Sequence, residues 1–224
     1  MARNNDVVKG KHRRLQRNVG TRTLINNYYI FYEGTSTEPN YFEAMKQVIT
    51  SDAAYSKVVH LEIIGKGRST LSLLNETKKY IKKNKISSGQ VWCVYDKDES
   101  TDDSFNQTSQ QISSLTNGEL SYHAAWSNES IEYWFLLHFV NNVSALTRKD
   151  YVKKLNECYQ KNKIPEGYDK DKKSAEQLFE RLNKYGNPLK AIKRAEKALK
   201  DYKESEIKNC PAKINPGTTV HLLV

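Results

Sequence analysis

Apolar and polar segments alternate along the chain in a way that predicts strands and helices in turn. Four runs rich in apolar, aromatic and β-branched residues are typical of strands: 27–32, 57–64, 90–95 and 121–126. The segments between them place apolar residues at helical spacing, with helices predicted to begin near Thr37 and Ser69 and to cover 103–116. This alternation predicts an α/β fold, in which a mainly parallel, Rossmann-like sheet is flanked by helices.

The pattern changes after the fourth predicted strand. An amphipathic helix is predicted from 128 to 142, and the chain from about 147 to 206 is helical in pattern and rich in lysine. We therefore expect three parts. These are a basic arm without stable structure at 1–22, an α/β core at 23–146, and a helical elaboration packed on the core at 147–224.

Composition narrows the class of protein. The chain has 224 residues, of which 38% are hydrophobic, so it can bury a core. No apolar run is long enough to span a bilayer, and the basic N-terminus has no signal-peptide core. We expect a soluble, cytoplasmic protein that does not associate with membranes.

The net charge of +10 favours binding to a polyanion, most often nucleic acid. A lysine-rich surface that only keeps the protein in solution is the alternative. Five cations are the candidate phosphate contacts: Arg13, Arg14, Lys66, Arg68 and Lys97. Lys66 and Arg68 lie in "GKGRS", which follows a strand and begins a helix, as phosphate-binding loops do. An ordinary strand–helix turn explains this segment equally simply, and it lacks the spacing of a nucleotide-hydrolysing loop.

Acidic residues follow two of the predicted strands directly. Glu33 comes after "YYIFY", and Asp96 and Asp98 come after "VWCVY". If these strands are neighbours, their carboxyl ends meet, and crowded carboxylates favour a divalent cation among them. Oxygen-only ligands suit Mg²⁺ or Mn²⁺. A solvated turn is the alternative explanation for Asp96, Asp98 and Glu99. The three cysteines form no CxxC pair, which argues against structural zinc.

The sequence resembles the RloB-like family, whose members are linked to phage defence and abortive infection. Four blocks carry the resemblance: "EGTSTEPNYFEAMK" (33–46), "CVYDKDE" (93–99), "SNESIEYWFLLHF" (127–139) and "NPGTTVHLLV" (215–224). A glutamate after one strand and DxD after a later one also resembles the Toprim domain of topoisomerases, bacterial primases and related nucleases. Glu129-Ser130 departs from the family, which has Pro-Cys or a similar pair after Ser-Asn.

The resemblance implies roles for particular residues. In a Toprim-like core, Asp96 and Asp98 would bind Mg²⁺ or Mn²⁺, and Glu33 would act as general acid or base or as a further ligand. Apart from the resemblance, Glu132 is an acidic residue among apolar neighbours near the start of the next predicted helix, which makes it a candidate metal ligand. The alternative is a carboxylate at the rim of a core helix. Three more residues are candidates for a supporting role: Glu38, Glu99 and Asn128.

The leading hypothesis is a Toprim-type, metal-dependent endonuclease that hydrolyses DNA or RNA, transfer RNA included, in antiphage abortive infection. The alternative is a non-catalytic, nucleic-acid-binding effector subunit that works with an ATPase partner, because RloB-like proteins resemble components of operons that encode ATPases. A primase-like nucleotidyl transferase is a third interpretation, without a sequence feature for nucleotide binding. The oligomeric state is open, with a homo-oligomer among the alternatives.

Overall fold

The fold is built around one sheet. The structure is a computed structural model that describes residues 26–34, 37–65, 70–98, 100–168 and 177–224. The described residues form a five-stranded sheet in the order β2-β1-β3-β4-β5. Its strands are β1 (Asn26–Tyr32), β2 (Val59–Gly65), β3 (Gly89–Asp96), β4 (Leu120–Asn128) and β5 (Gly217–Thr218). The first four run parallel and β5 is antiparallel to β4, which confirms the predicted α/β class and its mainly parallel sheet.

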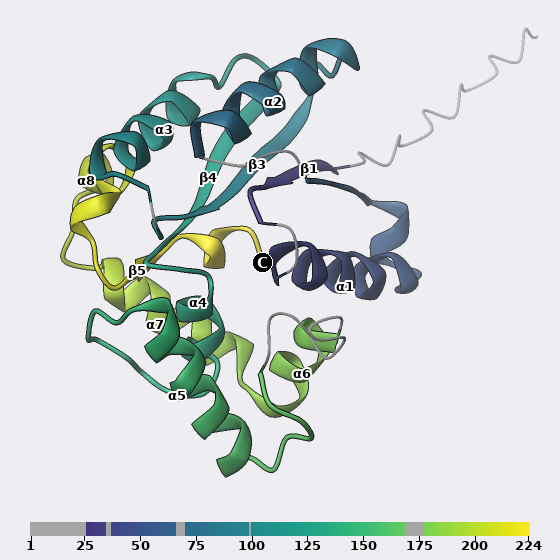
Figure 1. Cartoon of the computed structure of the whole chain (residues 1–224). Coiled ribbons are helices and arrows are strands. Elements are labelled where there is room, and N and C mark those ends of the chain that lie inside the picture. Colours follow the sequence, from purple (N-terminus) through teal and green to yellow (C-terminus); the bar gives the residue numbers. More distant parts are fainter. Residues whose placement is uncertain (1–25, 35–36, 66–69, 99, 169–176) are drawn as a thin grey trace, which may run out of the picture.

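Helices cover both faces of this sheet (Figure 1). They are α1 (Thr37–Ser51), α2 (Thr70–Lys83), α3 (Asp102–Ser114), α4 (Glu132–Leu137), α5 (Arg148–Lys161), α6 (Leu178–Tyr185), α7 (Pro188–Leu199) and α8 (Glu204–Asn209). Short 3₁₀ turns lie at Tyr55–Lys57, Pro211–Lys213 and Val220–Leu222. Helices α2 and α3 lie on one face, with α8 against α3, whereas α1 and α4 to α7 lie on the other.

Alternate residues of each strand feed two hydrophobic cores. On β3, Trp92 and Val94 pack toward α1 and α4, whereas Val91 and Cys93 pack toward α2 and α3. This alternation follows from the two-residue repeat of a strand, and burial on both faces explains why β3 reads as a nearly continuous apolar run.

The C-terminal region does more than pack beside the core. Strand β5 lengthens the sheet, since Thr218 and Gly217 pair with Ser127 and Asn128 of β4. The hydroxyl of Thr219 accepts a hydrogen bond from the backbone of Trp126 at 3.0 Å. The family block at 215–224 thus closes the sheet edge next to the end of β4.

The helix predicted at 128–142 is wrong in its extent. β4 continues to Asn128, and α4 covers only Glu132–Leu137. The last residues of β4 are buried and pair with both neighbouring strands, which holds them extended although their pattern also fits a helix. A cis peptide joins Asn128 to Glu129 between the two elements. In the described part of the chain, no helix has the length and apolar character that crossing a bilayer requires.

Candidate active site

The predicted meeting of two strand ends is present in the structure. β1 lies beside β3 in parallel register, with Tyr32 opposite Val94. The backbone N–H of Glu33 donates to the carbonyl of Val94 at 3.2 Å, so β1 ends directly beside the end of β3. Glu33 and Asp96 therefore leave the sheet at the same edge, which is where open α/β sheets bind ligands.

The second aspartate of DxD is held by the end of β4. The backbone N–H of Asp98 donates to the carbonyl of Glu129 at 2.9 Å, and that of Lys97 donates to Ser127 at 2.9 Å. Asp98 has a φ of 28°, in the left-handed region that aspartate tolerates better than most residues. The turn after β3 is thus fixed against the β4 end, and it directs Asp98 toward the same edge as Asp96.

Two helices add glutamates to this edge. Glu38 lies in the first turn of α1 with 6% of its surface exposed, and Glu132 begins α4 with 1% exposed. A β-carbon on Gly34 would lie 2.0 Å from a carboxylate oxygen of Glu38. The glycine after Glu33 therefore leaves the space that the Glu38 carboxylate fills.

Arg148, the first residue of α5, joins these carboxylates. Its Nη2 lies 2.7 Å from Oδ2 of Asp96, and its Nη1 lies 2.5 Å from Oδ2 of Asp98. Its Nε lies 3.4 Å from Oε2 of Glu132. One guanidinium thus contacts acidic residues that come from two separate elements of the α/β core.

A buried tyrosine completes the surroundings of Glu132. The hydroxyl of Tyr168 donates to Oε1 of Glu132 at 3.1 Å. Burial raises the pKa of Tyr168 well above its ordinary value, and the negative charge of Glu132 adds to this effect. Tyr168 therefore acts as a hydrogen-bond donor to the carboxylate.

Burial and mutual repulsion raise the pKa values of three of the acidic groups. The pKa of Glu33 rises to about 7, mainly through burial and then through the charges of Glu38 and Asp98. Burial is also the main cause of the raised pKa of Glu38 and of Asp96, and Arg148 opposes both shifts. Glu33 can hence gain or lose a proton near neutral pH, as a general acid or base must.

The acidic residues at this edge are called the carboxylate cluster here: Glu33, Glu38, Asp96, Asp98 and Glu132. Arg148 does not satisfy every oxygen of the carboxylate cluster. Among the described residues, Oδ1 of Asp96 and Oε2 of Glu132 are buried without a hydrogen-bond partner, as is Nε of Arg148. No three His, Cys, Asp or Glu side chains of the described residues are arranged to hold a metal ion as they stand. The donor set itself fits Mg²⁺ or Mn²⁺, because it consists of carboxylates with unpaired oxygens at one buried edge.

The other residues that the sequence analysis proposed for the site either make different contacts or lie outside the described residues. Asn128 donates to the carbonyl of Ala212 at 3.1 Å, so it holds the C-terminal segment, and within the described residues no hydrogen bond joins its side chain to the carboxylate cluster. Lys97 donates to the carbonyl of Ser100 at 2.5 Å and pairs with Asp102 at 3.1 Å, so it stabilises its own turn. The remaining candidates lie outside the described residues: Arg13, Arg14, Lys66, Arg68 and Glu99.

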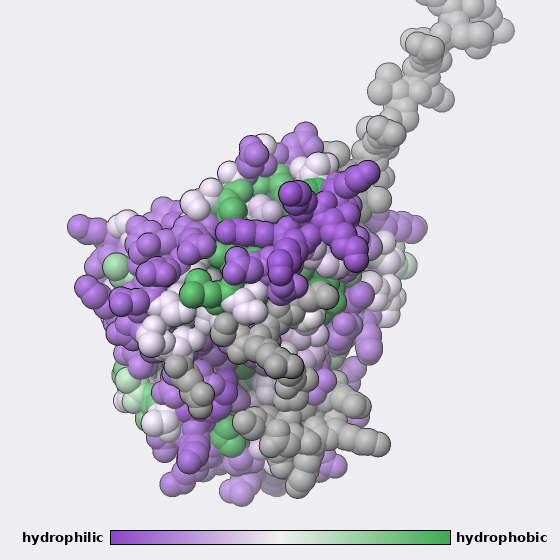
Figure 2. All heavy atoms as spheres, turned by 45° about the horizontal axis from the view of Figure 1, so that its top comes forward, coloured by the Kyte–Doolittle hydropathy of each residue, from purple (hydrophilic) through white to green (hydrophobic). Residues whose placement is uncertain are grey.

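Basic residues are nevertheless exposed on the described surface. Hydrophilic side chains gather over the α2 side of the molecule (Figure 2). The exposed lysines at the end of α2 and just after it are Lys79, Lys82, Lys83 and Lys85. These lysines thus form an exposed basic surface at this end of α2.

Sequence reasoning missed Arg148 and Tyr168. Both lie in the lysine-rich C-terminal region, where Arg148 is followed by Lys149 and reads as part of a solvated helix. The available signal was Thr147, whose hydroxyl accepts from the backbone of Asp150 and fixes the start of α5. A helix start predicted there places Arg148 at its first position, but nothing local indicates which residues it contacts.

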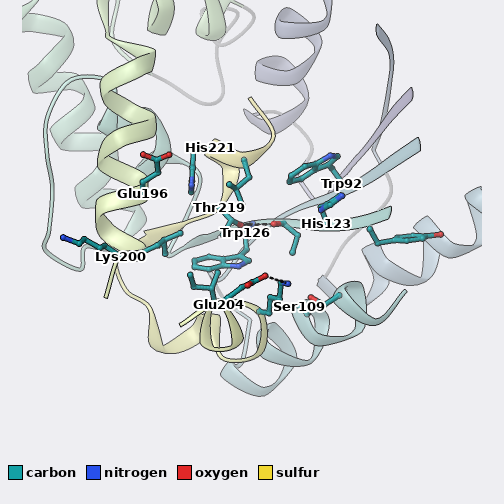
Figure 3. Close-up of a pocket in the computed structure, with 16 residues that line it drawn as sticks. Trp92, Ser109, His123, Trp126, Glu196, Lys200, Glu204, Thr219 and His221 are labelled. Atoms are coloured by element: carbon teal, nitrogen blue, oxygen red, sulfur yellow. Dashed lines mark hydrogen bonds and ion pairs between the residues drawn. The ribbon is translucent and has the colours of Figure 1, made fainter. Parts of the chain in front are cut away.

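A separate pocket of about 380 Å³ lies beside β4 (Figure 3). Its aromatic lining includes Trp126 and the rings of Trp92 and His123, which stack with their centroids 4.5 Å apart. None of the acidic residues around Arg148 lines it. The pocket and the carboxylate cluster are therefore distinct features, and only the cluster combines convergent carboxylates with raised pKa values.

The cysteines and the buried His138, which follows α4, are other residues that could take part in catalysis. Cys93, Cys158 and Cys210 are free, and burial raises the pKa of Cys93 to about 12. His138 is buried, and its pKa falls to about 4. Neither the Cys93 thiol nor the His138 imidazole is therefore poised for reaction at neutral pH.

Comparisons with known proteins give one family. The family model described as RloB-like protein matches residues 28–224, and this range contains all five acidic residues of the cluster together with Arg148. The chain has no significant match among curated proteins or among solved structures.

Proposed function

The chain belongs to the RloB-like family, and from this premise we propose that it is a metal-dependent nuclease acting in defence against phage. Membership of the family suggests a defence-associated protein. The proposal adds the chemistry, which is hydrolysis of a phosphodiester bond in DNA or RNA. The order of a glutamate after β1 and DxD after β3 resembles the Toprim pattern and supports this addition.

One observation carries the proposal. The carboxylates of Asp96 and Glu132 are buried together at the carboxyl edge of the sheet, and each has an oxygen without a hydrogen-bond partner in the part of the chain that the structure describes. Burying carboxylate oxygens that accept no hydrogen bond costs stability, so a cluster of this kind is difficult to explain by packing alone. A cation-binding centre gives these oxygens the partner that they lack.

The residues divide into two roles. Asp96, Asp98 and Glu132 would hold one or two Mg²⁺ or Mn²⁺ ions, which supply charge stabilisation at the phosphate and lower the pKa of water. Glu33 is the general acid or base, since its pKa of about 7 lets it exchange a proton near neutral pH.

The substrate is inferred from charge. The chain carries a net charge of +10, and the exposed lysines of α2 offer contacts to a phosphate backbone. Such contacts fix the position of a nucleic acid without reading its sequence. DNA and RNA both satisfy this requirement, so the first assay includes each.

The ion pairs of Arg148 favour a second candidate function. With Asp96 and Asp98 both paired to one guanidinium, the cluster is a plausible structural element of a nucleic-acid-binding effector subunit that cleaves nothing itself. Such a subunit would work beside an ATPase partner. Cleavage that depends on Asp96 separates the two functions.

The test compares three purified proteins on labelled plasmid and on total transfer RNA, with Mg²⁺, Mn²⁺ or EDTA. These are the wild type, Asp96→Asn, and the exposed control Asp201→Asn. The nuclease predicts metal-dependent cleavage by the wild type and the control, and cleavage by Asp96→Asn that falls to the level in EDTA. Cleavage by Asp96→Asn at the wild-type rate would contradict the proposal.

A further inference from the structure

Arg148 occupies the centre of the carboxylate cluster. It makes ion pairs at 2.7 Å with Asp96, 2.5 Å with Asp98 and 3.4 Å with Glu132. These three acidic residues are also the proposed ligands of the divalent cation. The guanidinium and the cation therefore need the same oxygens, and they cannot use them fully at the same time.

The fit between Arg148 and the cluster is incomplete. The Nε of Arg148 and Oε2 of Glu132 are near each other, yet both are buried and neither has a hydrogen-bond partner among the residues that the structure describes. Oδ1 of Asp96 is likewise unpaired. Carboxylate oxygens without hydrogen bonds suit a divalent cation better than they suit the planar guanidinium, because the guanidinium directs its N–H donors along fixed directions.

Arg148 can leave without unfolding its helix. Its side chain is 29% exposed, whereas that of Asp96 is 8% exposed, so the arginine lies on the solvent side of the pair. The start of α5 is fixed by Thr147, whose hydroxyl accepts from the backbone of Asp150. The guanidinium has no part in this cap, and its stem can turn outward while α5 stays in place.

From these observations we propose that Arg148 is an internal counter-ion that competes with the divalent cation, so that loading of the metal centre requires release of the guanidinium. This inference rests on the proposed metal centre and adds its regulation. Once released, Arg148 remains beside the site with its planar donors free, and these match the oxygens of a phosphate. Loading of the cation thereby exposes a contact for the nucleic-acid backbone.

The test measures Mn²⁺ binding directly, without an activity assay. Isothermal titration calorimetry compares the wild type with Arg148→Gln and with the neighbouring exposed control Lys149→Gln. Removing the competitor predicts Mn²⁺ binding that is about tenfold tighter in Arg148→Gln, which corresponds to about 1.4 kcal/mol. Lys149→Gln should bind as the wild type does. Equal or weaker binding by Arg148→Gln overturns the inference and leaves the metal centre intact.

A second variant and a second measurement protect the test against loss of folding. Arg148→Lys keeps the charge but not the forked donors, so its Mn²⁺ affinity should lie between those of the wild type and Arg148→Gln. Mn²⁺ should also raise the thermal midpoint of Arg148→Gln more than that of the wild type. Equal midpoint shifts in the two proteins contradict the competition. Absence of Mn²⁺ binding by every protein overturns the metal centre itself, together with this inference.

Discussion

The α/β core and the C-terminal region contribute opposite charges to the site. Residues from β1 to α4 supply the carboxylates, whereas α5 and the segment after it supply Arg148 and Tyr168. The core presents the acidic edge because parallel strands end together. The C-terminal region stabilises that edge by an ion pair and a hydrogen bond. The comparison shows that the acidic site of the core depends on a region far away in sequence.

The carboxylates of the core and the guanidinium of Arg148 have opposite effects on the stability of the fold. Burying the carboxylates of the core destabilises the fold, since charges leave water for a less polar surrounding. Arg148 offsets part of this cost. The ion pairs do not by themselves make the fold more stable, because removing both charged partners from water can cost as much as their attraction gains. Substitutions in the core and in the C-terminal region should therefore change the free energy of unfolding by different amounts, and these differences test the comparison.

Loss of Arg148 should have the largest effect on stability. In metal-free buffer, Arg148→Gln leaves Asp96 and Glu132 buried without the guanidinium that pairs with them, and the free energy of unfolding should fall by about 3 kcal/mol. Chemical denaturation measures this change, with Lys149→Gln as the control. An Arg148→Gln protein as stable as the wild type would show that the cluster does not need the C-terminal region.

The pH dependence of stability should reveal the cost on the core side. Burial raises the pKa of Glu33 from 4.5 to about 7. The folded protein thus keeps a proton that the unfolded chain releases in this range, and the free energy of unfolding should fall as pH rises from about 4.5 to about 7. The raised pKa values of Glu38 and Asp96 act in the same direction.

Denaturation in EDTA at several pH values measures this slope. Glu33→Gln has no proton to release, so its slope should be smaller than that of the wild type. An unchanged slope in Glu33→Gln would show that this carboxyl group has an ordinary pKa and is poorly suited to general acid–base chemistry.

The hydrogen bond from Tyr168 should contribute less than the ion pairs. Tyr168→Phe removes a donor to the buried Glu132 carboxylate while keeping the ring, and it should lower the free energy of unfolding by about 2 kcal/mol. The hydroxyl of the neighbouring Tyr159 has no hydrogen-bond partner among the described residues, so Tyr159→Phe is a matched control with a smaller expected effect. Equal losses in the two variants would assign the effect to ring packing.

Surface ion pairs should matter least. Lys208 pairs with Glu204 on the exposed side of α8, at 2.5 Å. Solvent screens such pairs, so Lys208→Gln should leave the denaturation midpoint unchanged within error. A clear loss in Lys208→Gln would show that distance alone, and not burial, decides the strength of ion pairs in this protein.

Local pattern was sufficient to predict the acidic edge. The runs that became β1 and β3 are rich in aromatic and β-branched residues, which favour strands, and Glu33 and Asp96 follow these runs directly. The sequence left the pairing of these two strands as a condition, and the structure meets it. Glu132 was also found locally, as an acidic residue among apolar neighbours, although the helix around it is shorter than its pattern indicates.

The rest of the site could not be read locally because its contacts are between distant segments. Arg148 lies 52 residues after Asp96, and Tyr168 lies 36 residues after Glu132. Strand β5 has only two residues, which is too short for a periodic signal. Asn128 looked suited to the site, but packing of the C-terminal segment gives it the carbonyl of Ala212 as a partner.

The most direct measurement is a crystal structure of the wild-type protein grown with Mn²⁺, using anomalous scattering to locate the ion. The account predicts an anomalous peak bounded by Asp96, Asp98 and Glu132, with the guanidinium of Arg148 moved away from Asp96. A structure in which Arg148 keeps its ion pairs and no Mn²⁺ lies among these carboxylates would contradict it.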